Sequence, residues 1–155
     1  MTSSPQRQPG GPESLAATAP TRPGKAQRAL LVDDDKFMLT VLTDLLQDLG
    51  VTSVTTAASG TEAALAFDKM LPPPEVILCD LKMPGGDGFQ FMEMLASRKF
   101  AGGVVLVSGM ETRVMNSASL MARFHHLNVL AALSKPVSVS ALGAALRSGP
   151  DGRRP

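Results

Sequence analysis

Five polar residues stand within two positions of the ends of four hydrophobic segments that lie far apart in the chain. They are, in order, Asp33 and Asp34 as a pair, then Asp80, Ser108 and Lys135. If the four segments were neighbouring strands of one parallel sheet, these side chains would meet, because the carboxyl ends of such strands share one edge. Three carboxylates, a hydroxyl and an ammonium group at that edge would suit a divalent cation together with a phosphoryl group.

The three carboxylates predict a bound cation. Crowded carboxylates repel one another and take up protons unless a positive charge lies among them. Magnesium suits the site best, because it prefers oxygen ligands, keeps several waters and commonly bridges to phosphate. We expect Asp34 and Asp80 to be direct ligands and Asp33 to act directly or through water. The backbone carbonyl of Lys82 would complete the set.

Asp80 is the candidate for covalent chemistry, since a carboxylate can act as a nucleophile and form an aspartyl phosphate. Its place in the chain is central, with partners on both sides. Lys135 would neutralise one phosphoryl oxygen, and Ser108 would donate a hydrogen bond to another. The bond between Lys135 and Pro136 is a candidate for a cis peptide bond, which would fix the direction of the lysine.

Glycines accompany two of the segments. Gly109 follows Ser108 and would leave space beside the phosphoryl group for water or a partner. Gly85, Gly86 and Gly88 predict a pliable loop after Asp80, because glycine restricts the backbone least.

Strand-like and helix-like segments alternate five times and would position these residues. The expected strands are 29–32, 51–57, 76–79, 104–107 and 129–133. The expected helices are about 36–49, 59–70, 88–99, 111–126 and 139–147. Strands separated by helices need right-handed crossovers and therefore form a parallel sheet. The sequence thus predicts an α/β fold, a doubly wound five-stranded parallel sheet in the order 2-1-3-4-5.

Local patterns support the first two helices. Apolar residues recur at the 3-and-4 spacing of an amphipathic helix. These residues are Met38, Val41, Leu42, Leu45, Leu46 and Leu49. Gly50 is the expected stop of that helix, and Ser59 with Glu62 forms a capping box that opens the next one. Asp35 is expected to be a charge in the first helical turn.

Composition limits the organisation to one domain. The 155 residues divide into an N-terminal arm at 1–27 with five prolines, an ordered domain at 28–147 and a flexible tail at 148–155. The arm holds almost no large apolar residue and is expected to be disordered. The domain has ten basic and twelve acidic residues, a net charge of −2, and its lack of a basic stripe argues against nucleic acid.

The chain also carries signals about its compartment. The single cysteine, Cys79, cannot form an internal disulfide, which favours a reducing cytoplasm. No apolar run approaches the roughly 20 residues that span a bilayer. The N-terminus shows no apolar core of a secretory signal. We therefore expect a cytoplasmic protein that does not enter a membrane.

Four motifs in this order resemble the receiver domain of two-component response regulators. They are Leu-Val-Asp-Asp-Asp at 31–35, Ile-Leu-Cys-Asp-Leu-Lys-Met-Pro-Gly-Gly-Asp-Gly at 77–88, Leu-Val-Ser-Gly at 106–109 and Ser-Lys-Pro at 134–136. The resemblance covers about 28–147 and implies the flavodoxin-like receiver fold. Any one motif is weakly specific, but the long motif, with the acidic pair before it and Lys-Pro after it, is strongly specific.

The resemblance implies a role for each matching residue in a phosphorelay. A histidine kinase or a histidine phosphotransfer protein would donate a phosphoryl group to Asp80, giving a 4-aspartylphosphate. Asp33 and Asp34 would form the magnesium site. Ser108 and Lys135 would sense the phosphoryl group and draw the domain into its active shape. The chain would be no enzyme beyond catalysing its own phosphorylation and dephosphorylation.

Signalling would then use protein–protein contact, without an output domain of the chain's own. The expected surface for the downstream partner is formed by the fourth helix, fifth strand and fifth helix, and a homodimer is left open. Two departures from the family bear on this step. Ala132 stands where relatives often carry a switching Tyr or Phe, and Ser108 and Lys135 are 27 positions apart, a few more than in most relatives. The excess is expected in the fourth-helix region, which resembles receivers fused to cyclic-di-GMP phosphodiesterases.

Three other functions fit part of the sequence. A receiver-fold scaffold that is never phosphorylated stays open because of Ala132. A phosphatase of the haloacid dehalogenase kind would use Asp33 and Asp35, but it needs an acidic pair after its lysine, and only Asp151 follows Lys135. A flavodoxin-like FMN binder is disfavoured, since the acids at 33–35 would repel the flavin phosphate.

Overall fold

The computed structural model describes residues 27–84, 87–109 and 126–147. Within them, five parallel strands form one sheet in the order β2-β1-β3-β4-β5. The strands are β1 (Arg28–Val32), β2 (Ser53–Ala57), β3 (Val76–Asp80), β4 (Gly103–Ser108) and β5 (Asn128–Ser134). The predicted fold class and strand order are therefore confirmed.

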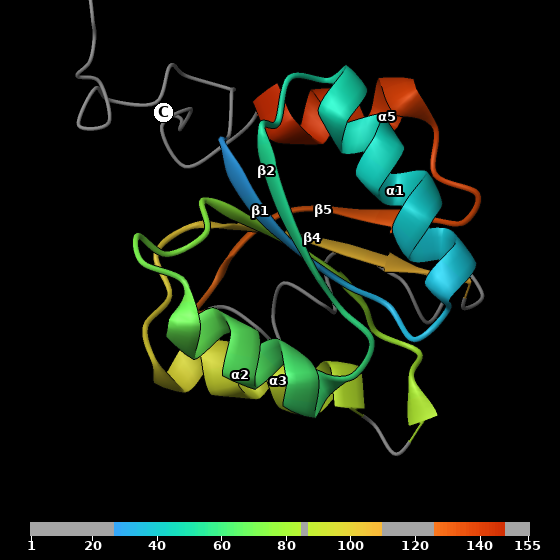
Figure 1. Ribbon diagram of the computed structural model, residues 1–155. Coiled ribbons are helices and arrows are strands. Elements are labelled where there is room, and N and C mark those ends of the chain that lie inside the picture. The colour runs from blue at the N-terminus through green and yellow to red at the C-terminus, as the bar shows by residue number, and fades with distance from the viewer. Residues whose placement is uncertain (1–26, 85–86, 110–125, 148–155) are drawn as a thin grey trace, which may run out of the picture.

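Helices cover both faces of the sheet (Figure 1). They are α1 (Lys36–Asp48), α2 (Gly60–Lys69), α3 (Asp87–Ser97) and α5 (Val139–Arg147). In Figure 1, α1 and α5 lie on one face, and α2 and α3 lie on the other. The fourth predicted helix lies almost wholly outside the described residues, as do the N-terminal arm before Gln27 and the tail after Arg147.

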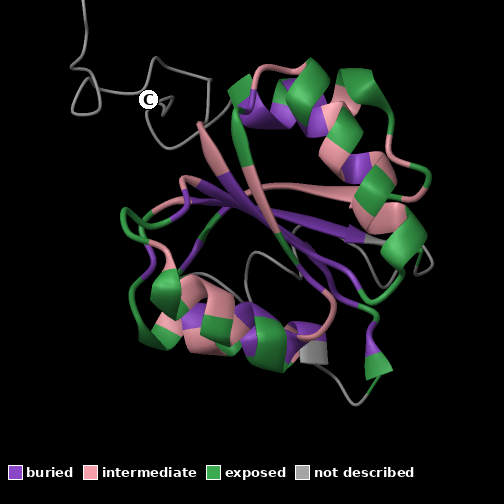
Figure 2. Cartoon of the chain, viewed as in Figure 1, coloured by how far each residue is buried: buried purple, intermediate pink, exposed green. Residues whose placement is uncertain are grey.

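Two apolar clusters fill the space between the helices and the sheet. One joins α2 and α3 to the sheet through residues such as Ala63, Met92 and Leu95. The other joins α1 and α5 to the opposite face through Leu42, Leu46 and Leu142. The central strands are buried along their length (Figure 2). This burial on both faces is why β3 and β4 are continuous apolar runs with no alternating pattern.

The predicted helix boundaries follow from their caps. Asp35 lies one residue before the first turn, in which it was expected, and caps α1, because its carboxylate accepts hydrogen bonds from the N–H groups of Phe37 and Met38. At the other end Gly50 has a positive φ of 98°, as a glycine stop requires. Its N–H donates to the carbonyl of Gln47, and that of Val51 donates to Leu46. Because the helix cap engages Val51, β2 begins at Ser53 and not at 51 as expected.

The second capping prediction is also confirmed. The hydroxyl of Ser59 accepts from the N–H of Glu62, and the Glu62 carboxylate accepts from the N–H of Ala58. No helix within the described ranges is long and apolar enough to cross a membrane.

Candidate functional site: an acidic cluster at the carboxyl edge of the sheet

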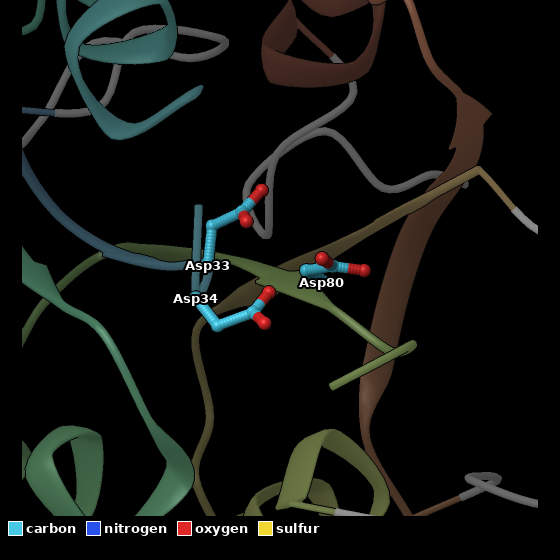
Figure 3. A group of neighbouring side chains, drawn as sticks. All are labelled: Asp33, Asp34 and Asp80. Atoms are coloured by element: carbon cyan, nitrogen blue, oxygen red, sulfur yellow. The ribbon is translucent and has the colours of Figure 1, made fainter. Parts of the chain in front are cut away.

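Three carboxylates meet where β1 and β3 end. Asp33 and Asp34 follow β1, and Asp80 is the last residue of β3. One carboxylate oxygen from each lies within 4.8 Å of the others. Figure 3 shows the group at the ends of the two strands. The sheet thus brings together residues that are more than forty positions apart in the chain.

The three acids have different environments. Asp33 is 1% exposed and Asp80 is 4% exposed, whereas Asp34 lies at the surface. The third acid of the run, Asp35, is engaged in capping α1 and is not part of the cluster. The Asp-Asp-Asp run therefore divides into a buried ligand candidate, an exposed ligand candidate and a helix cap.

The two buried carboxylates are held in the same way. The Oδ1 atom of Asp33 accepts from the N–H of Asp35 at 2.9 Å. The Oδ1 atom of Asp80 accepts from the N–H of Lys82 at 3.0 Å. In each case the donor is two residues further along the chain, so each turn fixes the rotation of its own carboxylate.

Lys135 bridges the two buried carboxylates from the end of β5. Its Nζ atom lies 2.9 Å from Oδ2 of Asp33 and 3.2 Å from Oδ2 of Asp80. The contact with Asp80 is also a hydrogen bond. The contact with Asp33 is an ion pair. Among the described residues, no hydrogen bond is made to the buried Oδ2 atom of Asp33. The lysine follows Ser134 and is joined to Pro136 by the expected cis peptide bond.

These contacts shift the ionisation of two groups. Burial raises the pKa of Asp80, and the nearby charge of Asp33 raises it further, while Lys135 and the Lys82 N–H oppose the change. Burial by itself would lower the pKa of Lys135. Its contact with Asp33 and the charges of Asp80 and Asp33 outweigh burial, so the pKa of Lys135 is raised. The ammonium therefore stays charged beside the carboxylates of Asp33 and Asp80.

The residues present fit a magnesium ion. All the clustered donors are hard oxygens, and the buried Oδ2 of Asp33 has lone pairs that no hydrogen bond engages among the described residues. Lys135 contacts the two buried carboxylates, and Asp34 adds a third carboxylate to the group, so the acids outnumber the ammonium. Asp33, Asp34 and Asp80 are thus able to hold the ion. A ligand role for the Lys82 carbonyl stays a prediction.

The remaining predicted residues lie at or near the same edge. Ser108 ends β4, and its backbone is paired in register with Ser134, the residue before Lys135. Its side chain lies outside what the structure describes. Among the described residues, no atom lies within 4 Å of a Cβ atom added to Gly109. Ala132 is half-buried and packs against the cluster on the α2–α3 face.

The expectation for Gly88 needs correction. Gly88 is not part of a pliable loop: it lies in the first turn of α3 and is buried. The excess spacing between Ser108 and Lys135 is expected in the fourth-helix region, which lies almost wholly outside the described residues. Within β5 the register with β4 shifts by one residue. Val104 pairs with Val129 but Val105 pairs with Ala131, so Leu130 is an extra residue in that strand.

The family model of the response regulator receiver domain matches residues 29–147. The chain therefore belongs to the response regulator receiver domain family, as the motifs predict. A protein-glutamate methylesterase/protein-glutamine glutaminase of Natronomonas pharaonis is 46% identical over 65 residues, which cover 40% of this chain and 17% of that protein. PdtaR, a transcriptional regulatory protein of Mycobacterium tuberculosis, is 30% identical over 128 residues, which cover 81% of this chain and 58% of that protein.

Solved structures show the same fold. A response regulator receiver domain protein from Clostridium thermocellum superposes with a TM-score of 0.67 at 25% identity, covering 78% of this chain and 91% of that chain. A chain of the CheX–CheY–BeF3–Mg2+ complex from Borrelia burgdorferi gives a TM-score of 0.65 at 20% identity, covering 78% and 87%. The likeness to receivers fused to cyclic-di-GMP phosphodiesterases stays a prediction.

Proposed function

We propose that this chain accepts a phosphoryl group on Asp80 and signals by binding a partner protein. The supporting observation is the contact of Asp80 with Lys135 beside the two acids of β1. A group transferred to Asp80 would lie between an ammonium and a cation site. The phosphoryl donor is a histidine kinase or a histidine phosphotransfer protein, as is general for receivers of this family.

The transfer is an in-line displacement at phosphorus. A carboxylate oxygen of Asp80 attacks the phosphorus of a phosphohistidine, and the bond from phosphorus to the imidazole nitrogen breaks. The electron pair of that bond stays with the departing imidazole, which takes a proton from water. The product is an acyl phosphate on Asp80. A bound Mg2+ would supply neutralising charge to the phosphoryl oxygens.

The residues of the chain prepare this step. The N–H of Lys82 holds one oxygen of Asp80 and so limits the rotation of the carboxylate. The ammonium of Lys135 neutralises charge that develops beside the other oxygen. Asp33, Asp34 and Asp80 would hold the cation, and Asp33 keeps the lysine directed into the site. Ser108 would donate to a phosphoryl oxygen.

The consequence of phosphorylation is a change in partner binding. We propose that the responding surface consists of the expected fourth helix, β5 and α5. We also propose a cytoplasmic location, where a histidine kinase or histidine phosphotransfer protein would donate the phosphoryl group. The chain acts as a phosphoryl acceptor and not as an enzyme on other substrates. No Tyr or Phe stands at Ala132, so the response would depend on Ser108, Lys135 and the loops they contact. That same alanine favours the second candidate, a scaffold that is never phosphorylated.

Intact-mass spectrometry after treatment with acetyl phosphate tests the proposal. One phosphoryl group should appear on the wild type with Mg2+, and none should appear with excess EDTA or in Asp80→Asn. Asp68→Asn, which alters an acid of α2 that pairs with Arg98 just after α3, is the matched control and should be phosphorylated normally. Phosphorylation that persists in Asp80→Asn would exclude Asp80 as the acceptor. A wild type that never gains mass would favour the scaffold.

A further inference from the structure

Gly88 packs directly against the backbone that carries Asp80. A Cβ atom at this position would lie 2.5 Å from the carbonyl oxygen of Asp80. It would also lie 2.8 Å from both the Cα atom and the carbonyl oxygen of Leu81. These are backbone atoms at the end of β3, so no side-chain rotation could relieve the contact. The first turn of α3 therefore rests on two successive peptide groups of the site.

Both peptide groups have other contacts that fix them in place. The N–H of Leu81 donates to the carbonyl of Val107 in the neighbouring strand at 3.2 Å. The carbonyl of Leu81 accepts from the N–H of Met83 at 3.1 Å. Because these bonds also hold the two peptides, a contact at residue 88 cannot be absorbed without rotating or shifting groups that are already hydrogen-bonded.

The second of these peptides controls the reacting carboxylate. The Leu81 carbonyl and the Lys82 N–H belong to one planar unit, so they move together. That N–H donates to Oδ1 of Asp80 at 3.0 Å. A rotation that moves the Leu81 oxygen away from residue 88 would therefore turn the N–H away from Asp80, and would move the Lys82 backbone at the same time.

We propose that Gly88 is a positioning residue for the phosphoryl site: the absence of a side chain there sets the Leu81–Lys82 peptide and, through it, the Asp80 carboxylate. This inference rests on the proposed function only for the identity of the cation, Mg2+. It gives Gly88 a role in the geometry of the site, beyond allowing α3 to pack on the sheet.

Gly102 provides a matched control at the opposite edge of the sheet. A Cβ atom there would lie 2.5 Å from the Phe100 ring and 2.7 Å from the carbonyl oxygen of Glu75. The shortest distance equals that at Gly88, and one contact is again with a backbone oxygen, but the crowding lies before β4 begins, away from the acids. Gly102→Ala should therefore disturb packing without disturbing the site.

The experiment compares the wild type, Gly88→Ala and Gly102→Ala as full chains. Mg2+ affinity is measured by titration calorimetry, and the Lys82 amide is followed by 1H–15N NMR in EDTA. Gly88→Ala should weaken Mg2+ binding about 10- to 100-fold, the range typical when a residue supporting a metal ligand is lost. It should also shift the Lys82 amide resonance. Gly102→Ala should leave both at wild-type values while losing thermal stability.

Gly88→Ala with the affinity and Lys82 resonance of the wild type would overturn the inference, and so would equal losses in the two variants. If Gly88→Ala does not fold, Lys82→Pro decides, because proline removes the donating N–H without adding an atom at residue 88. It should weaken Mg2+ binding over the same range, and wild-type affinity in Lys82→Pro would overturn the inference. A wild type that binds no Mg2+ would instead contradict the proposed function.

Discussion

The ammonium of Lys135 lies 2.9 Å from Oδ2 of Asp33, the most buried acid of the site. The sequence motifs give this lysine a role toward the phosphoryl group, but the structure also places it against Asp33, the first acid of the pair. The same ammonium contacts Asp80 at 3.2 Å. It therefore provides positive charge that the two buried carboxylates share when no cation is bound.

Removing this charge should destabilise the metal-free domain. In EDTA, Lys135→Met should lose about 1–3 kcal/mol of unfolding free energy, the cost of leaving a buried polar partner unsatisfied. In saturating Mg2+ the loss should shrink, because the cation supplies charge to the same carboxylates. Urea titrations in EDTA and in Mg2+ measure the loss of unfolding free energy. Lys82→Met, at an exposed lysine nearby, is the control. A loss that is equal with and without Mg2+ would contradict this explanation.

The adjacent acids Asp34 and Asp35 should separate metal binding from helix capping. Asp34→Asn should weaken Mg2+ binding about tenfold or more, yet change stability by no more than about 0.5 kcal/mol, because the side chain is exposed. Asp35→Asn should leave Mg2+ affinity unchanged, since asparagine caps helices as well as aspartate does. Calorimetry and urea unfolding give the two readouts. An equal loss of affinity in the two variants would mean that Asp35 also serves the cation.

Stability in EDTA should depend on the ionisation of Asp80. Its pKa in the folded chain is raised above the ordinary value of 3.8 by burial and by Asp33. Between the ordinary pKa of the unfolded chain and the raised pKa of the folded chain, the folded state binds more protons than the unfolded state. The contribution of Asp80 to stability therefore falls as pH rises through this range. Asp80→Asn should lose this part of the pH dependence and gain stability relative to wild type as pH increases. Urea midpoints from pH 4 to pH 7 measure the difference, and parallel curves would be inconsistent with the raised pKa.

Binding of a phosphoryl mimic at Asp80 should change hydrogen exchange in β5. Beryllofluoride with Mg2+ should change the hydrogen exchange of the amides from Ala132 to Ser134, because these residues lead into Lys135. Asp80→Asn treated in the same way is the control and should show no change. Wild-type exchange that is unaltered in β5 would indicate that the chain does not transmit the state of Asp80, as expected of a scaffold.

Much of the fold follows from local patterns. The β3 and β4 strands were predictable because continuous apolar runs suit strands covered on both faces. The α1 boundaries follow from Asp35 and Gly50, whose capping interactions depend on residues close in sequence. The start of β2 was less predictable. Val51 has strand character, but its N–H completes the cap of the preceding helix.

The acids of the site could be predicted because each stands at a strand end, and the topology of a parallel sheet brings strand ends together. Their individual environments could not be predicted. Asp33, Asp34 and Asp35 are chemically alike and adjacent, yet one is buried against Lys135, one is exposed and one caps a helix. The direction in which the chain leaves β1 decides among them.

Sequence patterns predict the order of the strands, the oxygen donors at their ends and the lysine that accompanies them. The packed structure is needed to show that Lys135 contacts Asp33 as well as Asp80, and that Gly88 packs against the backbone of the reacting residue. Periodicity and caps depend on neighbours within a few residues, so a sequence displays them. Contacts between the ends of different elements depend on how the helices pack on the sheet. Local sequence patterns do not predict the distances between these ends.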